Sequence, residues 1–175
     1  SNARTDWVVR NGTGRNTSEG AEFNANWKPT NSKFGLNFGY TFTDSYDAST
    51  CDPDELASYA DNECRLTGNK VAKAKVRVPR HAVETNISYS MNQNLKSFLK
   101  GKYIGETRDF GNTNDSWTDQ ILTDYFVFDL VHSYNLFDNY KIQIGINNIF
   151  DEKYQQAHEY STMRRTFNFG LKKVY

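Results

Sequence analysis

The run Y-K-I-Q-I-G-I-N-N-I-F-D-E-K-Y, residues 140–154, predicts how this chain folds. Its first half alternates strictly between two kinds of residue. The apolar set is Tyr140, Ile142, Ile144 and Ile146, and the polar or small set is Lys141, Gln143, Gly145 and Asn147. A period of two places the two sets on opposite faces of a β-strand. The second half, residues 147–154, is expected to leave the sheet and enter a loop.

The same alternation recurs along the chain and predicts an all-β protein. Phe34, Leu36, Phe38, Tyr40 and Phe42 form the clearest apolar stripe. Together with residues 140–147, the candidate strands are residues 4–10, 17–28, 34–42, 83–89, 95–105, 125–134 and 166–175. We therefore expect about eight antiparallel strands, with polar segments at 45–75, 106–120 and 151–162 as loops.

The connections between these strands differ in length in a regular way. The short turns at 29–32, 91–94 and 136–139 all fall at one end of the predicted sheet, and the long polar segments fall at the other. Transmembrane β-barrels have short turns on one side and long loops on the other. Alternation alone also fits a soluble sandwich or a small barrel with an apolar interior.

Composition narrows the class of protein. Aromatic residues make up 15% of the 175 residues, although the mean hydropathy is only -0.78. This combination suits a barrel in which alternate residues face lipid and aromatic girdles mark the interfaces. The formal net charge of +0 argues against a nucleic-acid partner. No apolar run has the length of a membrane-spanning helix, and no signal peptide is evident.

Residues 1–3, Ser-Asn-Ala, have the composition of an expression-tag scar, and residues 4–175 are interpreted as one domain. Cys51 and Cys64 flank a polar segment, which favours a disulfide in an oxidising compartment over a metal site. Asp52, Asp54 and Asp61 in the same segment are oxygen ligands of the kind that Ca²⁺ prefers, although a solvated acidic loop explains them more simply.

Several short motifs resemble TonB-dependent outer-membrane receptors. The run 147–154 resembles the family's N-N-L-F-D-x-x-Y, and Gly20-Ala21-Glu22 resembles its G-x-E strand. Further resemblances are Tyr40-Thr41-Phe42-Thr43-Asp44, Val78-Pro79-Arg80-His81, Tyr103-Ile104-Gly105, Arg165-Thr166-Phe167 and the terminal Tyr175. The chain departs from the family's Pro-Gly before the last arginine, because Met163-Arg164 stands there.

The resemblance implies a fold and a function. The chain is expected to be the C-terminal part of a transmembrane barrel of about 22 strands, with a plug domain upstream. Such a receptor lies in the bacterial outer membrane, contacts lipid, and imports a ferric siderophore or cobalamin with energy delivered by TonB through the plug. An arc of strands cut from a barrel exposes two sheet edges, so it either closes on itself or pairs with another copy.

Candidate site residues follow from the placement of basic and aromatic side chains in the predicted loops. If the cargo is an anionic ferric siderophore, arginine and aromatic side chains suit it. The candidates are Arg108, Trp117, His158, Tyr160 and Arg164. The sequence has no G-x-S-x-G or H-E-x-x-H motif, so we expect neither an enzyme nor a cofactor.

Two other classes of protein remain open on sequence alone. One is a self-contained eight-stranded barrel, either an outer-membrane adhesion protein or a lipocalin-like ligand binder. The other is a secreted glycan-binding sandwich, for which only Trp7, Trp27 and Trp117 are available as platforms, and they do not cluster in sequence. A plug domain upstream of the chain would exclude the first alternative.

Overall fold

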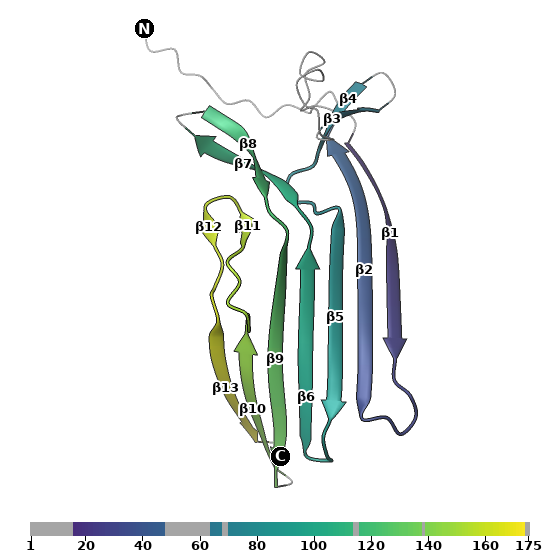
Figure 1. The fold of residues 1–175 in the computed structure, drawn as a ribbon, viewed down its shortest axis with the longest axis vertical. Helices are drawn as coiled ribbons and strands as arrows, with labels where there is room; N and C mark the ends of the chain where they lie inside the picture. Colours follow the sequence, from purple (N-terminus) through teal and green to yellow (C-terminus); the bar gives the residue numbers. More distant parts are fainter. Residues whose placement is uncertain (1–15, 48–63, 68–69, 114–115, 138, 174–175) are drawn as a thin grey trace. The chain divides into compact units, whose positions relative to one another are not determined.

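A computed structural model describes residues 16–47, 64–67, 70–113, 116–137 and 139–173. Every regular element within these ranges is a β-strand (Figure 1). The described residues contain no helix long and apolar enough to cross a membrane. The expected strand at residues 4–10, Cys51 of the expected disulfide, and the Ca²⁺ candidates Asp52, Asp54 and Asp61 lie outside the described residues.

The strands alternate with short turns and longer connections, and they divide into two units. Unit 1 comprises residues 1–18 and 45–75, and unit 2 comprises residues 19–44 and 76–175. The strands are β1 (Asn16–Trp27), β2 (Phe34–Asp47), β3 (Cys64–Thr67), β4 (Lys70–Ala74), β5 (His81–Ser90), β6 (Leu95–Ile104), β7 (Thr107–Thr113), β8 (Ser116–Leu122), β9 (Tyr125–Leu136), β10 (Tyr140–Asn147), β11 (Gln155–Ala157), β12 (Tyr160–Ser161) and β13 (Thr166–Lys173).

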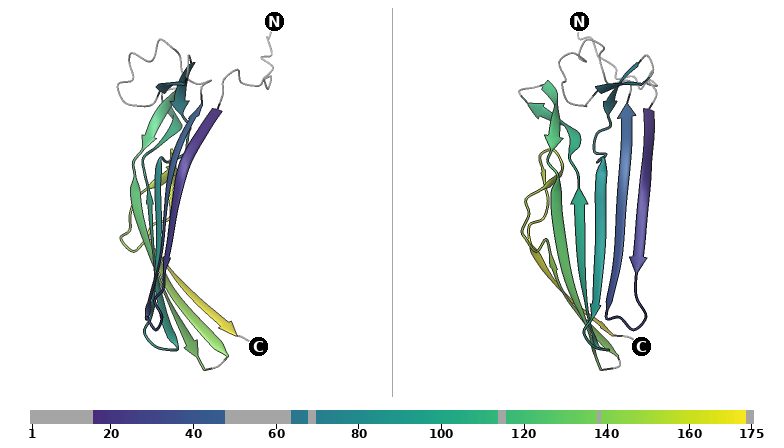
Figure 2. Two further views of the ribbon diagram at one scale, coloured as in Figure 1. Left: turned by 90° about the vertical axis from the view of Figure 1, so that its right-hand side faces the viewer. Right: turned by 45° about the vertical axis from the view of Figure 1, so that its right-hand side comes forward.

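The sheet of unit 2 is a curved antiparallel meander (Figure 2). Its hydrogen-bonded order is β13-β10-β9-β6-β5-β2, and β1 pairs with the other edge of β2. The predicted strands between residues 17 and 173 are thus confirmed. Among the described strands β13 and β1 do not pair with each other, so the sheet is not closed into a small barrel.

The short turns lie together at one end of this sheet, as the sequence predicted (Figure 1). In the first, Asn31 adopts a positive φ of 63° and the Ser32 N–H donates to the Pro29 carbonyl at 3.1 Å. In the second, the Asn92 Oδ1 accepts from the N–H groups of Asn94 and Leu95. Asparagine tolerates left-handed backbone and bonds nearby N–H groups, which explains its use in both turns.

Two segments expected to be plain loops contain hairpins, so these expectations were partly wrong. The predicted loop 106–120 holds β7 and most of β8, which pair from Thr107↔Leu122 to Thr113↔Ser116. The predicted loop 151–162 holds β11 and β12. Their polar composition hid them, because strands are recognised in a sequence by an apolar stripe and these hairpins have none.

Within unit 1 the segment 45–75 also contains strands where we expected a loop. The end of β2 pairs with β4 through Tyr46↔Ala74 and Asp47↔Lys73, and β4 pairs with β3. The pairing Thr67↔Lys70 leaves only Gly68 and Asn69 between β3 and β4.

One face of the sheet in unit 2 is mostly apolar. Side chains of five strands meet on it in a single cross-strand row, Leu36↔Ile87↔Leu99↔Leu130↔Ile146. Many of its side chains face outward, including Phe126 at 56% and Phe169 at 71% exposure. In the described residues only Tyr46, Leu122 and Tyr125 are buried hydrophobic side chains. An exposed face this apolar is typical of the outer surface of a transmembrane barrel.

Aromatic side chains flank the aliphatic row on both sides. Towards the loop end, Tyr40, Tyr103 and Phe126 lie on one cross-strand row through Val83. Towards the turn end, the Phe34 and Tyr89 rings contact each other at a tilt of 31°, with centroids 4.5 Å apart. This arrangement is typical of the two aromatic girdles of a transmembrane barrel.

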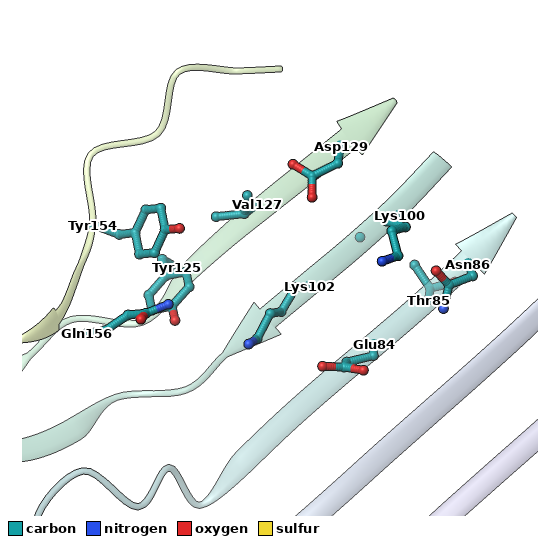
Figure 3. Close-up of a pocket in the computed structure, with 11 residues that line it drawn as sticks. Glu84, Thr85, Asn86, Lys100, Lys102, Tyr125, Val127, Asp129, Tyr154 and Gln156 are labelled. Atoms are coloured by element: carbon teal, nitrogen blue, oxygen red, sulfur yellow. The ribbon is translucent and has the colours of Figure 1, made fainter. Parts of the chain in front are cut away.

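The opposite face of the same sheet is polar. Its central cross-strand row is Asn37↔Asn86↔Lys100↔Asp129, and Glu84 pairs with Lys102 in the next row. Side chains of both rows line a pocket of about 250 Å³ (Figure 3). A polar face behind an apolar belt is the arrangement of a wet barrel lumen.

Candidate functional site

The end of β10 is fixed by the motif that opened the sequence analysis. Asn148 is 4% exposed and has a positive φ of 52°, a conformation that asparagine tolerates better than most residues. Its side-chain oxygen accepts from the Glu152 N–H at 2.8 Å, and its amide donates to the Glu152 carbonyl at 2.9 Å. The Asn148 N–H donates to the Asp129 carboxylate at 2.8 Å. Asn148 therefore closes the turn through which the chain enters the last loop.

Asp151 anchors the start of the last strand to the same turn. Its carboxylate accepts hydrogen bonds from the Arg164 guanidinium and, at 2.9 Å, from the Arg165 N–H. The Arg164 hydrogen bond is the main reason that the pKa of Asp151 falls to about 2. This chain has Met163-Arg164 where the family it resembles has Pro-Gly, and here the Asp151 carboxylate holds the segment that enters β13.

A second carboxylate, Asp109 on β7, ties three segments together. It is 1% exposed, and it accepts from the His158 N–H at 2.7 Å, the Phe110 N–H at 2.8 Å and the Arg77 Nε at 2.9 Å. Burial raises the pKa of Asp109, but these three hydrogen bonds outweigh burial and hold the pKa below its usual value. Asp109 thus joins the β7–β8 hairpin to the loop that carries β11 and β12.

Gly111 on β7 lies at the same contact between the β7–β8 hairpin and the last loop. A Cβ atom at this position would lie 2.6 Å from the His158 Nε2, so only glycine leaves room for the imidazole ring. Further along the loop, the Thr162 hydroxyl donates to the Tyr154 carbonyl at 2.8 Å and closes the base of the β11–β12 hairpin. The Tyr154 ring stacks on Tyr125 with centroids 4.2 Å apart.

These contacts shape a pocket of about 660 Å³ at the loop end of unit 2. Its lining comes from β8, from the residues after it and from the last loop. The lining residues are Gln120, Ile121, Leu122, Thr123, Lys153, Tyr154, Gln155, His158, Ser161, Thr162 and Arg164. Lys153, His158 and Arg164 are basic, and the described lining includes no carboxylate. Basic groups and hydroxyl donors on an aromatic and aliphatic wall suit an anionic ligand.

The structure brings two of the predicted cargo residues together in this pocket. His158 and Arg164 both line it, from different parts of the last loop. Tyr160 on β12 is 73% exposed. Trp117 lies on β8 opposite Asn112, and its side chain is outside the described part of the structure.

Arg108 lies elsewhere, in a buried setting. It is 6% exposed, and its Nε and Nη2 donate to the Asp119 carboxylate across the β7–β8 hairpin at 3.0 and 2.7 Å. Its guanidinium also lies 4.6 Å from the centroid of the Phe110 ring. These contacts give Arg108 a role in holding the hairpin together, and its contact with cargo stays a prediction.

The other two histidines lie on the apolar face as hydrogen-bonded pairs. His81 Nδ1 is 2.9 Å from the Tyr40 hydroxyl, and His132 Nδ1 is 2.8 Å from the Ser97 hydroxyl. The described residues contain no group of three His, Cys, Asp or Glu side chains placed to hold a metal ion.

Sequence reasoning missed Asp109, Lys153, and the two glutamines and two threonines that line the pocket. Lys153 lies in the motif at residues 147–154. Its position in the loop after the strand was the only feature of the sequence that could have indicated a pocket residue. Asp109 carried no signal, because its partners Arg77 and His158 lie 32 and 49 residues away in the sequence.

Comparison with known proteins agrees with this geometry. The class that the fold defines is a wall of an outer-membrane type of β-barrel, with an apolar belt on one face and polar side chains on the other. The family described as "TonB dependent receptor-like, beta-barrel" matches residues 1–149. The chain therefore belongs to the TonB-dependent receptor-like β-barrel family, a family of outer-membrane receptors and transporters and not of enzymes. No curated protein sequence matches the chain.

Solved structures of similar fold include two receptors and an iron transporter. The ferripyoverdine receptor of the Pseudomonas aeruginosa outer membrane aligns with a TM-score of 0.66 and 17% identity, over 90% of this chain and 19% of that one. The ferric-catecholate import receptor Fiu of E. coli K12 has a TM-score of 0.69 and 19% identity, over 92% and 21%. The FrpB iron transporter of Neisseria meningitidis has a TM-score of 0.64 and 13% identity, over 92% and 24%.

These alignments show a shared fold. The chain spans about a fifth of the length of the receptors that it matches. The match to one part of large barrels, together with the unclosed sheet, favours a segment of a larger barrel over a self-contained eight-stranded barrel or a secreted sandwich.

Proposed function

We propose that this chain is part of the barrel wall of a bacterial outer-membrane receptor for TonB-energised import of a ferric siderophore or a similar chelate. Cobalamin is the other candidate cargo. In this proposal residues 4–175 form the C-terminal segment of the barrel, and TonB acts through a plug domain outside this chain. The family match and the apolar face of the sheet support the membrane location.

The observation that carries the proposed cargo class is the basic pocket at the loop end. Lys153, His158 and Arg164 bring positive charge to one cavity of about 660 Å³. That volume falls in the range of small-molecule sites, about 300–1,000 Å³. The side chain of Arg164 is 50% exposed while it pairs with Asp151, so the guanidinium keeps a surface that can face a ligand. Many ferric chelates are anionic and bulky, and they match this charge and size.

The proposal is tested by uptake in cells. The full-length parent is expressed in a strain without its own ferric-siderophore and cobalamin receptors, with and without TonB. Uptake of radiolabelled iron from a panel of siderophores, and of labelled cobalamin, is then measured. TonB-dependent uptake of one cargo is the expected result. Absence of any TonB-dependent uptake by protein that is folded in the outer membrane contradicts the proposal.

A pair of lysine variants tests the pocket itself. Lys153→Gln removes a charge from the pocket lining, whereas Lys33→Gln makes the same change beside a short turn at the other end of the sheet. A hydrogen bond to a charged group contributes about 1.5–3 kcal/mol. Lys153→Gln should therefore raise the cargo concentration for half-maximal uptake roughly tenfold, and Lys33→Gln should leave it unchanged. Equal effects of the two variants would remove the pocket from the proposal.

A further inference from the structure

Two pockets of unit 2 meet at Tyr154. The loop-end pocket is the cavity of about 660 Å³ that Lys153, His158 and Arg164 help to line. The polar-face pocket is the cavity of about 250 Å³ on the polar side of the sheet. Of the described residues, only Tyr154 lines both cavities. The Tyr154 side chain therefore stands between the two pockets.

The chain next to Tyr154 also runs between the two pockets. Lys153 and Gln155 line the loop-end pocket, whereas Gln156 lines the polar-face pocket. Gln155 and Gln156 are neighbours on β11, and successive side chains of a strand point to opposite sides. Figure 3 shows Tyr154 and Gln156 together with Tyr125 at one end of the polar-face pocket. This segment is therefore a wall with one pocket on each side.

Contacts of both the ring and the backbone hold this wall in place. The Tyr154 ring stacks on Tyr125 with centroids 4.2 Å apart, and Tyr125 is only 7% exposed. The Tyr154 carbonyl accepts from the Thr162 hydroxyl at 2.8 Å, and the His158 N–H donates to the Asp109 carboxylate at 2.7 Å. Because the backbone is anchored at both points, unstacking of the Tyr154 ring is the smallest movement that joins the two pockets.

The two pockets also differ in charge. The described lining of the loop-end pocket carries three basic side chains and no carboxylate. In the polar-face pocket, Lys102 lies opposite Glu84 and Lys100 lies opposite Asp129 (Figure 3). Opposite charges attract and like charges repel, so an anionic molecule favours the first pocket over the second. The wall at Tyr154 thus separates a basic pocket from one whose charges are balanced.

We propose that the Tyr154 ring closes the passage between the loop-end pocket and the polar-face pocket. While the ring is stacked on Tyr125, a small molecule in the loop-end pocket stays there. Without the ring the two pockets become one continuous cavity. The inference rests on the proposed function only in taking the chain as part of an outer-membrane barrel wall whose loop end faces the medium. It does not depend on which cargo is imported.

Thiol labelling of the full-length receptor in intact cells tests the proposal. Val127→Cys places a thiol in the polar-face pocket, and Ser161→Cys places one in the loop-end pocket. The probe is sulfonatoethyl methanethiosulfonate, which is small and anionic. The cells lack general porins, so the probe reaches the receptor from outside only. Mass spectrometry of the peptide that contains the new cysteine measures the labelling rate at that position and excludes signal from Cys51 and Cys64.

The expected result is faster labelling of the polar-face pocket when the ring is removed. Tyr154→Ala should speed labelling of Val127→Cys roughly tenfold, because it removes both the ring and its stacking contact. Tyr154→Leu, which lacks the ring but keeps an apolar side chain, is a second variant in case the first does not fold, and it should act in the same direction. Tyr154→Phe keeps the ring and should leave the rate unchanged. Labelling of Ser161→Cys should be the same with every residue at position 154.

Two results would overturn the proposal. One is an unchanged labelling rate of Val127→Cys in the variants without the ring. The other is an equal acceleration of Ser161→Cys, because the last loop would then have opened as a whole. The uptake assay is separate from this test. Failed uptake with the expected labelling pattern would reject the proposed cargo and leave the role of Tyr154 standing, and successful uptake without that pattern would do the reverse.

Discussion

The Asp109 carboxylate offers the sharpest test of how the last loop is held. Its Oδ2 accepts from the His158 N–H, and its Oδ1 accepts from the Phe110 N–H and the Arg77 Nε. Asp109→Asn keeps the size of the side chain but turns one oxygen into a donor. If the remaining oxygen faces Phe110 and Arg77, the new amide faces the His158 N–H, and the hydrogen bond to the loop is lost.

The expected loss of loop stability in Asp109→Asn can be worked out from these hydrogen bonds. A hydrogen bond to a charged group contributes about 1.5–3 kcal/mol. The Arg77 side chain is 57% exposed, so solvent screening discounts its share of the loss. We expect local opening of the last loop to become easier by about 2 kcal/mol, which corresponds to roughly 30-fold faster hydrogen exchange across residues 153–162.

Hydrogen exchange with mass spectrometry on the full-length receptor in detergent measures this change. Asp124→Asn is the matched control, because Asp124 is exposed and accepts a hydrogen bond from the Tyr103 hydroxyl, at 3.1 Å, away from the last loop. The same exchange rate in Asp109→Asn and in the unmodified protein would refute the role assigned to Asp109.

The pH dependence of the stability of the last loop gives an independent check of the Asp109 contacts. The pKa of Asp109 is lower in the folded protein than its ordinary value of about 3.9. Its stabilisation is therefore fully present above that ordinary value and is lost as pH falls through the lower folded value. The difference between Asp109→Asn and the unmodified protein should shrink in strong acid and stay constant from about pH 5 upward.

Three further substitutions probe other parts of the structure. Gly111→Ala forces the new Cβ against the His158 ring and should cost about 1–3 kcal/mol of loop stability, measured by hydrogen exchange. Gly170→Ala is the control and should cost little, because its Cβ would lie 3.9 Å from its nearest neighbour, Gln143. Equal costs would contradict the packing described. Asn148→Ala removes both side-chain bonds to Glu152 and should destabilise the folded protein by about 1–3 kcal/mol, which is measured as the folded fraction on unboiled gels; an unchanged folded fraction would show that this turn closes without them. Ile144→Arg places a charge on the apolar face, where Ile144 is 53% exposed, and should reduce the free energy of folding into lipid vesicles by up to about 4 kcal/mol. Gln143→Arg on the polar face should be tolerated. The reverse order would mean that the two faces are assigned wrongly.

The amino-acid sequence by itself determined the strands of the main sheet and which residues share a face. Phe34 to Phe42 and Tyr140 to Ile146 alternate because successive strand residues point to opposite sides, and that property is local. The segregation of short turns also follows from chain order, since each short turn reverses the strand at the same end. The motif at 147–154 and the shorter motifs along the chain indicate the family on their own, and the family match confirms it.

Tertiary structure decided the parts that depend on contacts between distant residues. The β7–β8 hairpin is polar, so its strands show no apolar stripe that a local pattern could reveal. The contact of Arg108 with cargo stays a prediction, whereas its burial against Asp119 follows from the pairing between β7 and β8 and could not be predicted locally. His158 and Arg164 line one pocket only because Asp109 and Asp151 hold the last loop at these two residues. Such positions are set by the hydrogen bonds of buried or half-buried carboxylates with partners 13–49 residues away, and no local periodicity encodes them.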